Sequence, residues 1–244
     1  MTVTFSVLPG PDDVAHAAAT AFVEASRAAV AARGRFYAAI PGGRTPLPAF
    51  VLLTGPAFHD RVPWERVELF WADERAVGPD DPQSNYRAAR EVLLDHAPSL
   101  STGQVHRMMA EAVDLETGAR AYEAELRRVV PAGPDGIPVL DLVWLGVGAD
   151  GHTASLCPND PSLAVTDRLV VPTWPAGYDT ARLTLTYPVL NAAREIVFAV
   201  NGADKAETLA AIRAGADLPA ARVRAAQTRW LVDAAAAGQV ADPV

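Results

Sequence analysis

Short apolar segments alternate with longer segments of helical periodicity along most of this sequence. Alternation of this kind is typical of parallel strands joined by crossover helices. The most hydrophobic strand candidate is Val139–Gly146, which reads VLDLVWLG. The sequence therefore predicts an α/β fold with a mostly parallel sheet covered by helices on both faces. We expect strands at residues 3–8, 35–40, 67–71, 139–146, 169–172, 182–186 and 195–200, and helices near residues 12–33, 47–53, 86–96, 115–130 and 205–214.

The length of 244 residues suits one large domain or two small ones, and with 50% apolar residues a full core can form. The best candidate for a domain boundary is the Pro/Gly-rich connector at residues 131–138. This connector is a loop, because it is too short for a convincing domain linker. We therefore expect a single domain that spans residues 1–244.

The formal net charge is -8 and the pI is near 5.1. This average field repels polyanions such as nucleic acid and repels anionic membrane surfaces. We therefore expect no nucleic-acid partner and no membrane partner. An anionic small molecule would have to meet a local cluster of cationic side chains.

The sequence contains one cysteine, Cys157, which excludes an intramolecular disulfide. No paired Cys and His spacing indicates a zinc site, so we expect no metal. The first 22 residues lack a basic segment followed by an apolar one, and no stretch of 18 uncharged apolar residues occurs. These features predict a cytoplasmic protein.

Unusual residues follow three of the predicted strands, at the ends where ligands bind in open parallel sheets. The first group is the turn Pro41–Pro46, which contains Gly42, Gly43, Arg44 and Thr45. Glycines let an anion approach the backbone amides, and the start of the following helix adds a positive dipole. The turn therefore has the form of a phosphate cradle, although an ordinary strand-to-helix turn can have the same composition.

The second group is Asp73-Glu74-Arg75, with Asn85 in the loop that precedes the next helix. A carboxylate beside a guanidinium can orient sugar hydroxyls and stabilise a developing oxyanion. An asparagine amide can donate to or accept from a polyol. A solvated, salt-bridged loop is the alternative interpretation of this segment.

The third group follows the strand at residues 139–146 and contains Asp150 and His152. Histidine is the side chain whose ordinary pKa best suits removal of a proton from water near neutral pH. Asp150 can orient the imidazole or bind substrate hydroxyls, whereas a capping or core histidine is the alternative. The other histidines have no such neighbours in the sequence, and we interpret them as surface or packing residues; they are His16, His59, His96 and His106.

Two cations complete a possible phosphate site. Arg182 begins the predicted strand at residues 182–186, and Lys205 lies near the N-terminus of the last predicted helix. An isolated Arg or Lys is more often a plain surface charge. Their positions at the boundaries of predicted elements are what make these two residues candidates.

Six motifs, in order, resemble those of the 6-phosphogluconolactonases, within the glucosamine-6-phosphate isomerase/6-phosphogluconolactonase family: GGRTP, FWADER, DPQSNYRAAREVLL, LGVGADGHTASLCP, RLTLTYPVLNAA and NGADKAETL. The resemblance implies a modified Rossmann-like fold, shared with glucosamine-6-phosphate deaminases, ribose-5-phosphate isomerases and CoA transferases. It also implies hydrolysis of 6-phospho-D-glucono-1,5-lactone to 6-phospho-D-gluconate in the oxidative pentose phosphate pathway. No metal or organic cofactor is implied.

The resemblance assigns roles to individual residues. His152 matches the general base, with Asp150 beside it, and Arg75 matches an arginine that faces the ligand. These three are the candidate catalytic residues. The candidate substrate-binding residues are Gly42, Gly43, Arg44, Thr45, Asp73, Asn85, Arg182 and Lys205.

Three positions depart from the family pattern. Pro41 precedes the glycine turn, Arg44 stands where serine is common, and Cys157 stands where the lactonases usually have phenylalanine. Arg44 can strengthen anion binding or point away, so its role stays open. We interpret Cys157 as a small packing residue, because no base is assigned to it.

Two alternative functions remain open at this point. Aminosugar-phosphate deaminases share the fold and the phosphate site, but they typically carry Asn-Glu-Pro shortly after the histidine, where this sequence has Leu156-Cys157-Pro158. A non-catalytic sugar-phosphate sensor would be joined to a DNA-binding module, for which we expect no room. The expected partner is a phosphorylated sugar lactone, and the expected state is a monomer or a weak homodimer.

Overall fold

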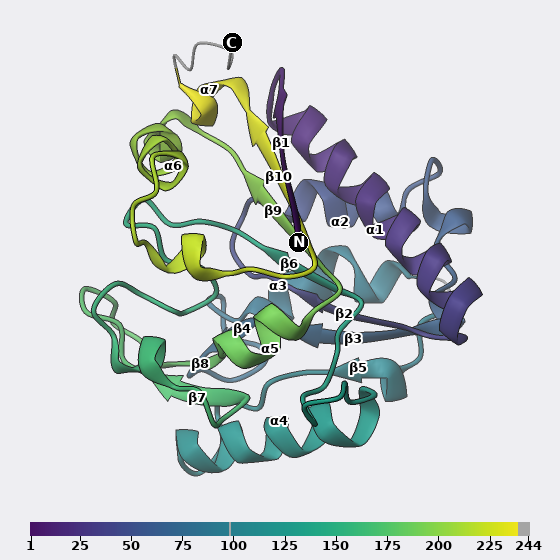
Figure 1. Cartoon of the computed structure of the whole chain (residues 1–244). Helices are drawn as coiled ribbons and strands as arrows, with labels where there is room; N and C mark the ends of the chain where they lie inside the picture. The colour runs from purple at the N-terminus through teal and green to yellow at the C-terminus, as the bar shows by residue number, and fades with distance from the viewer. Residues whose placement is uncertain (98, 239–244) are drawn as a thin grey trace.

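The computed structural model describes residues 1–97 and 99–238. Its main element is a sheet of seven strands, and every neighbouring pair in it is parallel (Figure 1). This sheet confirms the predicted mostly parallel arrangement. In spatial order the strands are β1 (Thr2–Leu8), β10 (Gln227–Asp233), β9 (Glu195–Val200), β6 (Leu142–Leu145), β2 (Phe36–Ile40), β3 (Val67–Trp71) and β5 (Val105–His106).

Helices lie on both sides of the sheet, as predicted, and Figure 1 shows α1 and α6 on opposite sides of the strands. The helices are α1 (Pro11–Arg33), α2 (Leu47–Thr54), α3 (Asn85–Val92), α4 (Leu115–Val129), α5 (Tyr187–Ala192), α6 (Ala206–Arg213) and α7 (Ala234–Ala237). Single 3₁₀ turns occur at residues 59–61, 64–66, 94–96, 102–104, 161–164, 203–205 and 219–222. None of the described helices is long and apolar enough to cross a membrane.

The boundaries of α1 follow from its flanking residues. The helix begins after Gly10, whose amide donates to the Asp13 carboxylate at 3.1 Å, so it starts slightly earlier than the predicted position near Asp12. It ends at Arg33, and the next residue, Gly34, has a φ of 78° and donates its amide to the Val30 carbonyl oxygen. A glycine accepts this left-handed conformation at little cost, which explains why the helix stops there.

The centre of the sheet contains a point where the strand order reverses. β2 and β6 lie side by side, and the sheet continues from β2 to β3 and β5 but from β6 to β9, β10 and β1. The loops that follow β2 and β6 therefore leave the sheet in different directions. Open α/β sheets bind ligands in the crevice between two such loops. Here the loops are the glycine turn after β2 and the segment that carries His152 after β6.

The strands predicted at residues 169–172 and 182–186 are present, but they lie outside the parallel sheet. Three strands form a separate antiparallel sheet in the order β4-β8-β7, where β4 is Asp73–Arg75, β7 is Val170–Thr173 and β8 is Arg182–Leu185. The chain between β7 and β8 contains no helix, and parallel neighbours need a crossover of about a dozen residues or more. A short connection of this kind therefore gives antiparallel pairing.

Three of the strands have no counterpart among the predicted strands: β4, β5 and β10. β10 inserts between β1 and β9, where the Trp230 ring stacks between Phe5 and Phe198 at centroid distances of 5.3 and 3.9 Å.

Two predicted elements are also shorter than expected. β6 covers only residues 142–145, and α3 ends at Val92 before a 3₁₀ turn.

His106 is a buried packing residue, and it also has charged neighbours that are distant in the sequence. Its side chain is 5% exposed in β5, with Nε2 2.9 Å from Glu68 Oε2 and Nδ1 2.7 Å from Glu125 Oε1. Its ring also stacks on Phe70 at a centroid distance of 4.4 Å. The buried imidazole of β5 is therefore hydrogen-bonded to Glu68 of β3 and to Glu125 of α4, and it links these three elements.

We expect His106→Ala to lower the free energy of unfolding by about 3 kcal/mol, because it leaves the buried Glu68 carboxylate without one of its partners. Equilibrium urea denaturation measures this change. His96→Ala is the matched control, because His96 is exposed, and we expect it to stay within about 0.5 kcal/mol of the unchanged protein. Equal effects of the two substitutions would contradict a stabilising role for His106.

Candidate active site

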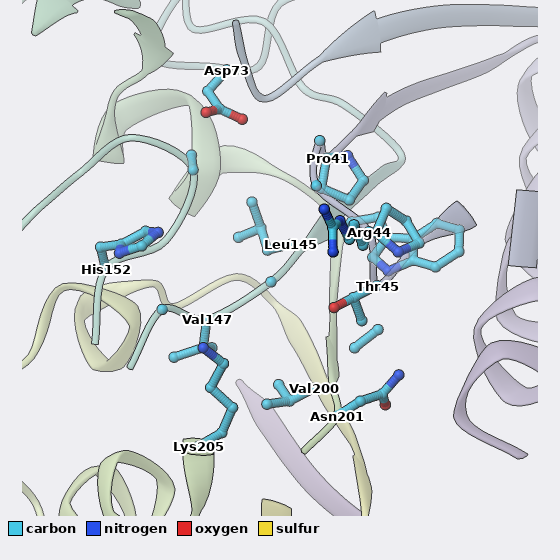
Figure 2. A pocket seen from close by; sticks show the side chains of 18 of the residues that line it. Pro41, Arg44, Thr45, Asp73, Leu145, Val147, His152, Val200, Asn201 and Lys205 are labelled. Carbon is cyan, nitrogen blue, oxygen red and sulfur yellow. The ribbon is translucent and has the colours of Figure 1, made fainter. Parts of the chain in front are cut away.

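A pocket opens at the reversal point of the sheet, between the loops that follow β2, β6 and β9 and the small antiparallel sheet. Nine of the candidate site residues line it: Gly42, Gly43, Arg44, Thr45, Asp73, Arg75, His152, Arg182 and Lys205. Figure 2 shows His152, Asp73, Arg44 and Lys205 around this pocket. The other two candidates, Asp150 and Asn85, hold residues that line the pocket.

His152 and Asp150 form a hydrogen-bonded pair in the loop that follows β6. His152 Nδ1 lies 2.6 Å from Asp150 Oδ1, which also accepts the His152 backbone amide at 3.1 Å. A carboxylate at Nδ1 favours the tautomer that carries its proton on this nitrogen. Nε2 then keeps its lone pair, and His152 lines the pocket, so the pair can act as an oriented base.

The charge of Asp150 is stabilised by its neighbour. Partial burial raises the pKa of the Asp150 carboxyl, but the hydrogen bonds and the charge of His152 outweigh this effect, so the pKa lies below its ordinary value. Asp150 is therefore ionised throughout the neutral range. An ionised carboxylate holds the imidazole and stabilises the positive charge that forms when His152 accepts a proton.

A glycine beside the pair leaves the space that the imidazole needs. A Cβ atom on Gly148 would lie 2.0 Å from His152 Nδ1 and 2.6 Å from Asp150 Oδ1. We expect Gly148→Ala to displace the imidazole and to lower kcat/KM about 10²-fold, since a shift of this size is enough to misalign a base. Steady-state kinetics measure this. Gly78→Ala is the control, because its added methyl group meets no atom within 4 Å, and equal activities of the two variants would contradict this geometry.

The glycine turn after β2 lies on the opposite side of the pocket. Gly43 has a φ of 82°, a conformation that other residues adopt with strain. A Cβ atom on Gly42 would lie 1.8 Å from Asn85 Oδ1, so the turn needs glycine to pack against Asn85. Arg44 is exposed and lines the pocket, where Figure 2 shows it beside Thr45. Of the two roles that the sequence allows for Arg44, this position favours anion binding over a side chain that points away from the site.

The Asp73-Glu74-Arg75 triplet forms β4, so its side chains alternate between two faces. Asp73 and Arg75 line the pocket, whereas Glu74 does not. Asp73 Oδ2 accepts a hydrogen bond from Ser155 Oγ at 2.6 Å, and Asn85 Nδ2 donates to Asp73 Oδ1 at 3.3 Å. Asn85 therefore acts by holding Asp73 and the glycine turn together.

The Glu74 side chain lies on the other face of β4 and binds the start of α3. Its carboxylate accepts hydrogen bonds from the Asn85 and Tyr86 amides at 2.7 and 2.8 Å and from Ser84 Oγ at 3.0 Å. Burial raises the pKa of this carboxyl in spite of these bonds. The contacts fasten the start of α3 to β4, which fixes the loop that lies between them.

Two further residues reach the site without having been predicted. Tyr178 lies in the loop between β7 and β8, with its Oη 3.5 Å from His152 Nδ1 and its ring 4.3 Å below the Arg182 guanidinium carbon. Asn201 lines the pocket, and its buried Oδ1 has no hydrogen-bond partner among the described residues. Asn201 directly follows β9, so attention to every strand end would have identified it. Tyr178 has no comparable signal in the sequence.

Four cations and one carboxylate line the pocket: Arg44, Arg75, Arg182, Lys205 and Asp73. The pocket is therefore locally positive in a chain whose net charge is -8, as an anionic ligand requires. Lys205 is the only lysine in the sequence. Its Nζ lies 2.9 Å from Asp204 Oδ2, at the start of α6.

Cys157 is buried close to this site. Burial and, to a smaller extent, the nearby charge of Asp150 raise the pKa of its thiol to about 11. The thiol therefore stays protonated near neutral pH, which makes it a poor nucleophile. This agrees with its interpretation as a packing residue.

Comparison with known proteins gives one family. Residues 9–232 match the family of glucosamine-6-phosphate isomerases/6-phosphogluconolactonase. The chain is 42% identical to a 6-phosphogluconolactonase of Synechocystis over 75% of this chain and 74% of that one. It is 37% identical to a 6-phosphogluconolactonase of Streptomyces coelicolor over 93% of this chain and 90% of that one.

The fold agrees with this match. The crystal structure of a 6-phosphogluconolactonase from Thermotoga maritima superposes with a TM-score of 0.82 at 30% identity, and it covers 95% of this chain and 100% of that one. A monomeric glucosamine-6-phosphate deaminase superposes with a TM-score of 0.78 at 20% identity, which shows a shared fold. The modified Rossmann-like fold is thus confirmed. The chain belongs to the glucosamine-6-phosphate isomerase/6-phosphogluconolactonase family.

Proposed function

We propose that this chain hydrolyses 6-phospho-D-glucono-1,5-lactone to 6-phospho-D-gluconate in the oxidative pentose phosphate pathway. The observation that carries the proposal is one pocket in which the His152–Asp150 pair faces a group of cationic side chains. Relatives of 36–42% identity named as 6-phosphogluconolactonases support the same reaction. We further propose a monomer or weak homodimer in the cytoplasm, without a nucleic-acid or membrane partner.

The phosphate end of the substrate binds to the amides of the glycine turn and to Arg182 and Lys205. Backbone amides next to Gly43 can approach an anion closely, and a charged side chain strengthens each hydrogen bond to phosphate. Once the phosphate is bound, the lactone carbonyl lies near His152, and the reaction pays little further translational or rotational entropy of the substrate. Binding energy at the phosphate thereby serves the reaction at C1.

At the other end, His152 Nε2 removes a proton from water, and the resulting hydroxide attacks the C1 carbonyl carbon. Arg75 or amides of the loop after β6 stabilise the tetrahedral oxyanion. The oxyanion then collapses with cleavage of the bond between C1 and the ring oxygen. The protonated His152 returns its proton to that oxygen, which leaves a hydroxyl at C5 and a carboxylic acid at C1. The acid then releases its proton to solvent and becomes a carboxylate.

The experiment compares two substrates with one preparation of the protein. We expect saturable hydrolysis of freshly generated 6-phospho-D-glucono-1,5-lactone above its spontaneous rate, and no release of ammonia from glucosamine 6-phosphate. Ammonia release would favour the deaminase, whose expected glutamate is replaced by Cys157 in this chain. Ligand binding without turnover of either compound would favour a sugar-phosphate sensor.

Lys205→Ala tests the phosphate clamp. We expect KM to rise roughly tenfold to a hundredfold with little change in kcat, because the ammonium group contacts a part of the substrate that does not react. Initial rates over a range of lactone concentrations separate the two constants, and Lys205→Arg is the control that keeps the charge. A fall in kcat alone would contradict the clamp.

A further inference from the structure

Three potential metal ligands come together beside the reacting centre. The carboxylate of Asp150, a ring nitrogen of His152 and Sγ of Cys157 all lie within 4.8 Å of one another. The local fold explains this, because the chain reverses between Thr153 and Leu156, which pair through their backbone, and Ala154 takes a positive φ of 49°. The turn returns Cys157 to the side of the His152–Asp150 pair.

The donor set has a clear chemical preference. One thiolate, one imidazole and one carboxylate form a ligand group typical of zinc, whereas magnesium and calcium prefer oxygen ligands. Zinc bonds of about 2.0–2.3 Å place tetrahedral ligand atoms roughly 3.3–3.7 Å apart. The distances between the three ligand atoms in the structure differ from these tetrahedral distances by at most about 1.5 Å. The Asp150 side chain is 45% exposed, so it can rotate to complete the group.

We propose that a zinc-type divalent cation binds to Asp150, His152 and Cys157 and inhibits the enzyme. The binding site stands on the geometry of the three ligands. The inhibitory consequence rests on the proposed function, in which His152 is the base. The resemblance puts phenylalanine at the position of Cys157, and phenylalanine offers no ligand atom to a cation.

The inhibition follows from the two nitrogens of the imidazole. In the active pair, the proton is on Nδ1 and the lone pair is on Nε2. A cation on Nε2 occupies this lone pair directly. A cation on Nδ1 displaces the proton there, and the neutral ring then carries its proton on Nε2, where it can no longer accept one from water. The Cys157 thiol proton is released to solvent when the thiolate binds the cation.

Cobalt(II) absorption tests binding separately from activity. A thiolate ligand gives Co²⁺ a charge-transfer band in the near ultraviolet, and Cys157 is the only cysteine, so the band has a single possible source. We expect the full-length protein to develop this band, zinc chloride to abolish it by displacement, and Cys157→Ser to lack it. His152→Ala is expected to weaken it, and magnesium chloride is expected to leave it unchanged.

Lactone hydrolysis tests the inhibitory consequence. We expect zinc chloride to inhibit the unchanged enzyme, and a chelator to restore its rate. Cys157→Ser should hydrolyse the lactone normally but need at least about tenfold more zinc for half inhibition, because even outer partners of a metal site contribute 10–100-fold to affinity. Cys157→Ala provides a second variant of similar size.

The outcomes separate the two claims. Absence of the cobalt band in the unchanged protein would overturn the metal site, whether or not the protein hydrolyses the lactone. A cobalt band without zinc inhibition, or equal zinc inhibition in Cys157→Ser, would overturn the inhibitory role. If the protein lacks lactonase activity altogether, the proposed function fails while the spectroscopic test of the site remains decisive.

Discussion

His152→Ala is expected to lower kcat for hydrolysis of 6-phospho-D-glucono-1,5-lactone by about 10²–10⁴-fold, which is the usual contribution of a positioned base. The alanine variant keeps the cationic end of the pocket, so we expect KM to change little. The side chain of His152 is 20% exposed and belongs to a loop, so its removal leaves the core intact. Steady-state kinetics and thermal unfolding measure the two effects.

His96→Ala is the matched control for this experiment. His96 is exposed after the end of α3 and does not line the pocket, so its removal should leave kcat unchanged. A His152→Ala protein with full kcat would show that another group activates the water. A variant that loses activity only because it unfolds would be recognised by its melting temperature.

Asp150→Asn is expected to lower kcat by a similar factor, about 10²–10⁴-fold, although the shape of the side chain hardly changes. An amide can donate to His152 Nδ1, and the ring then carries its proton on Nε2, where the base is needed. The substitution also removes the negative charge that stabilises the protonated imidazole. The effect should appear in kcat more than in KM.

The dependence of kcat/KM on pH provides a second readout for this pair. The rate should rise with pH on the acid side, because His152 must lose a proton before it can accept one from water. The pKa of Asp150 is lowered by the hydrogen bonds and charge of His152 in spite of burial, so the carboxyl stays ionised across this range. The acid limb should therefore follow a single proton, and a two-proton limb or an unchanged Asp150→Asn enzyme would contradict the assigned roles.

Most of the parallel sheet could be predicted, because the signals of β1, β2, β3, β6 and β9 are local. Strands such as Val67–Trp71 and Glu195–Val200 are apolar runs bounded by polar segments, and the helices between them show clear periodicity. The small antiparallel sheet could not be predicted in the same way. Its pairing joins Asp73–Arg75 to Arg182–Leu185, which lie more than a hundred residues apart. Nothing in the sequence of either segment indicates which strand it pairs with.

The sequence predicts those site residues that lie in loops after strands. It does not predict residues that reach the site only through contacts between distant segments. His152 and Arg44 belong to the loops that follow β6 and β2, so topology brings them to the same edge of the sheet. Tyr178 reaches His152 only through the fold of the β7–β8 loop. His106 shows the same limit, because its two carboxylate partners come from another strand and from a helix.

The most direct test of His152 as the base of a lactonase is the initial rate of hydrolysis of freshly generated 6-phospho-D-glucono-1,5-lactone after subtraction of its spontaneous hydrolysis, measured with the unchanged protein and with His152→Ala. We expect a saturable enzymatic rate for the unchanged protein and a rate about 10²–10⁴-fold lower for the variant. No rate above spontaneous hydrolysis in the unchanged protein, or equal rates for the two proteins, would show that His152 does not have this role.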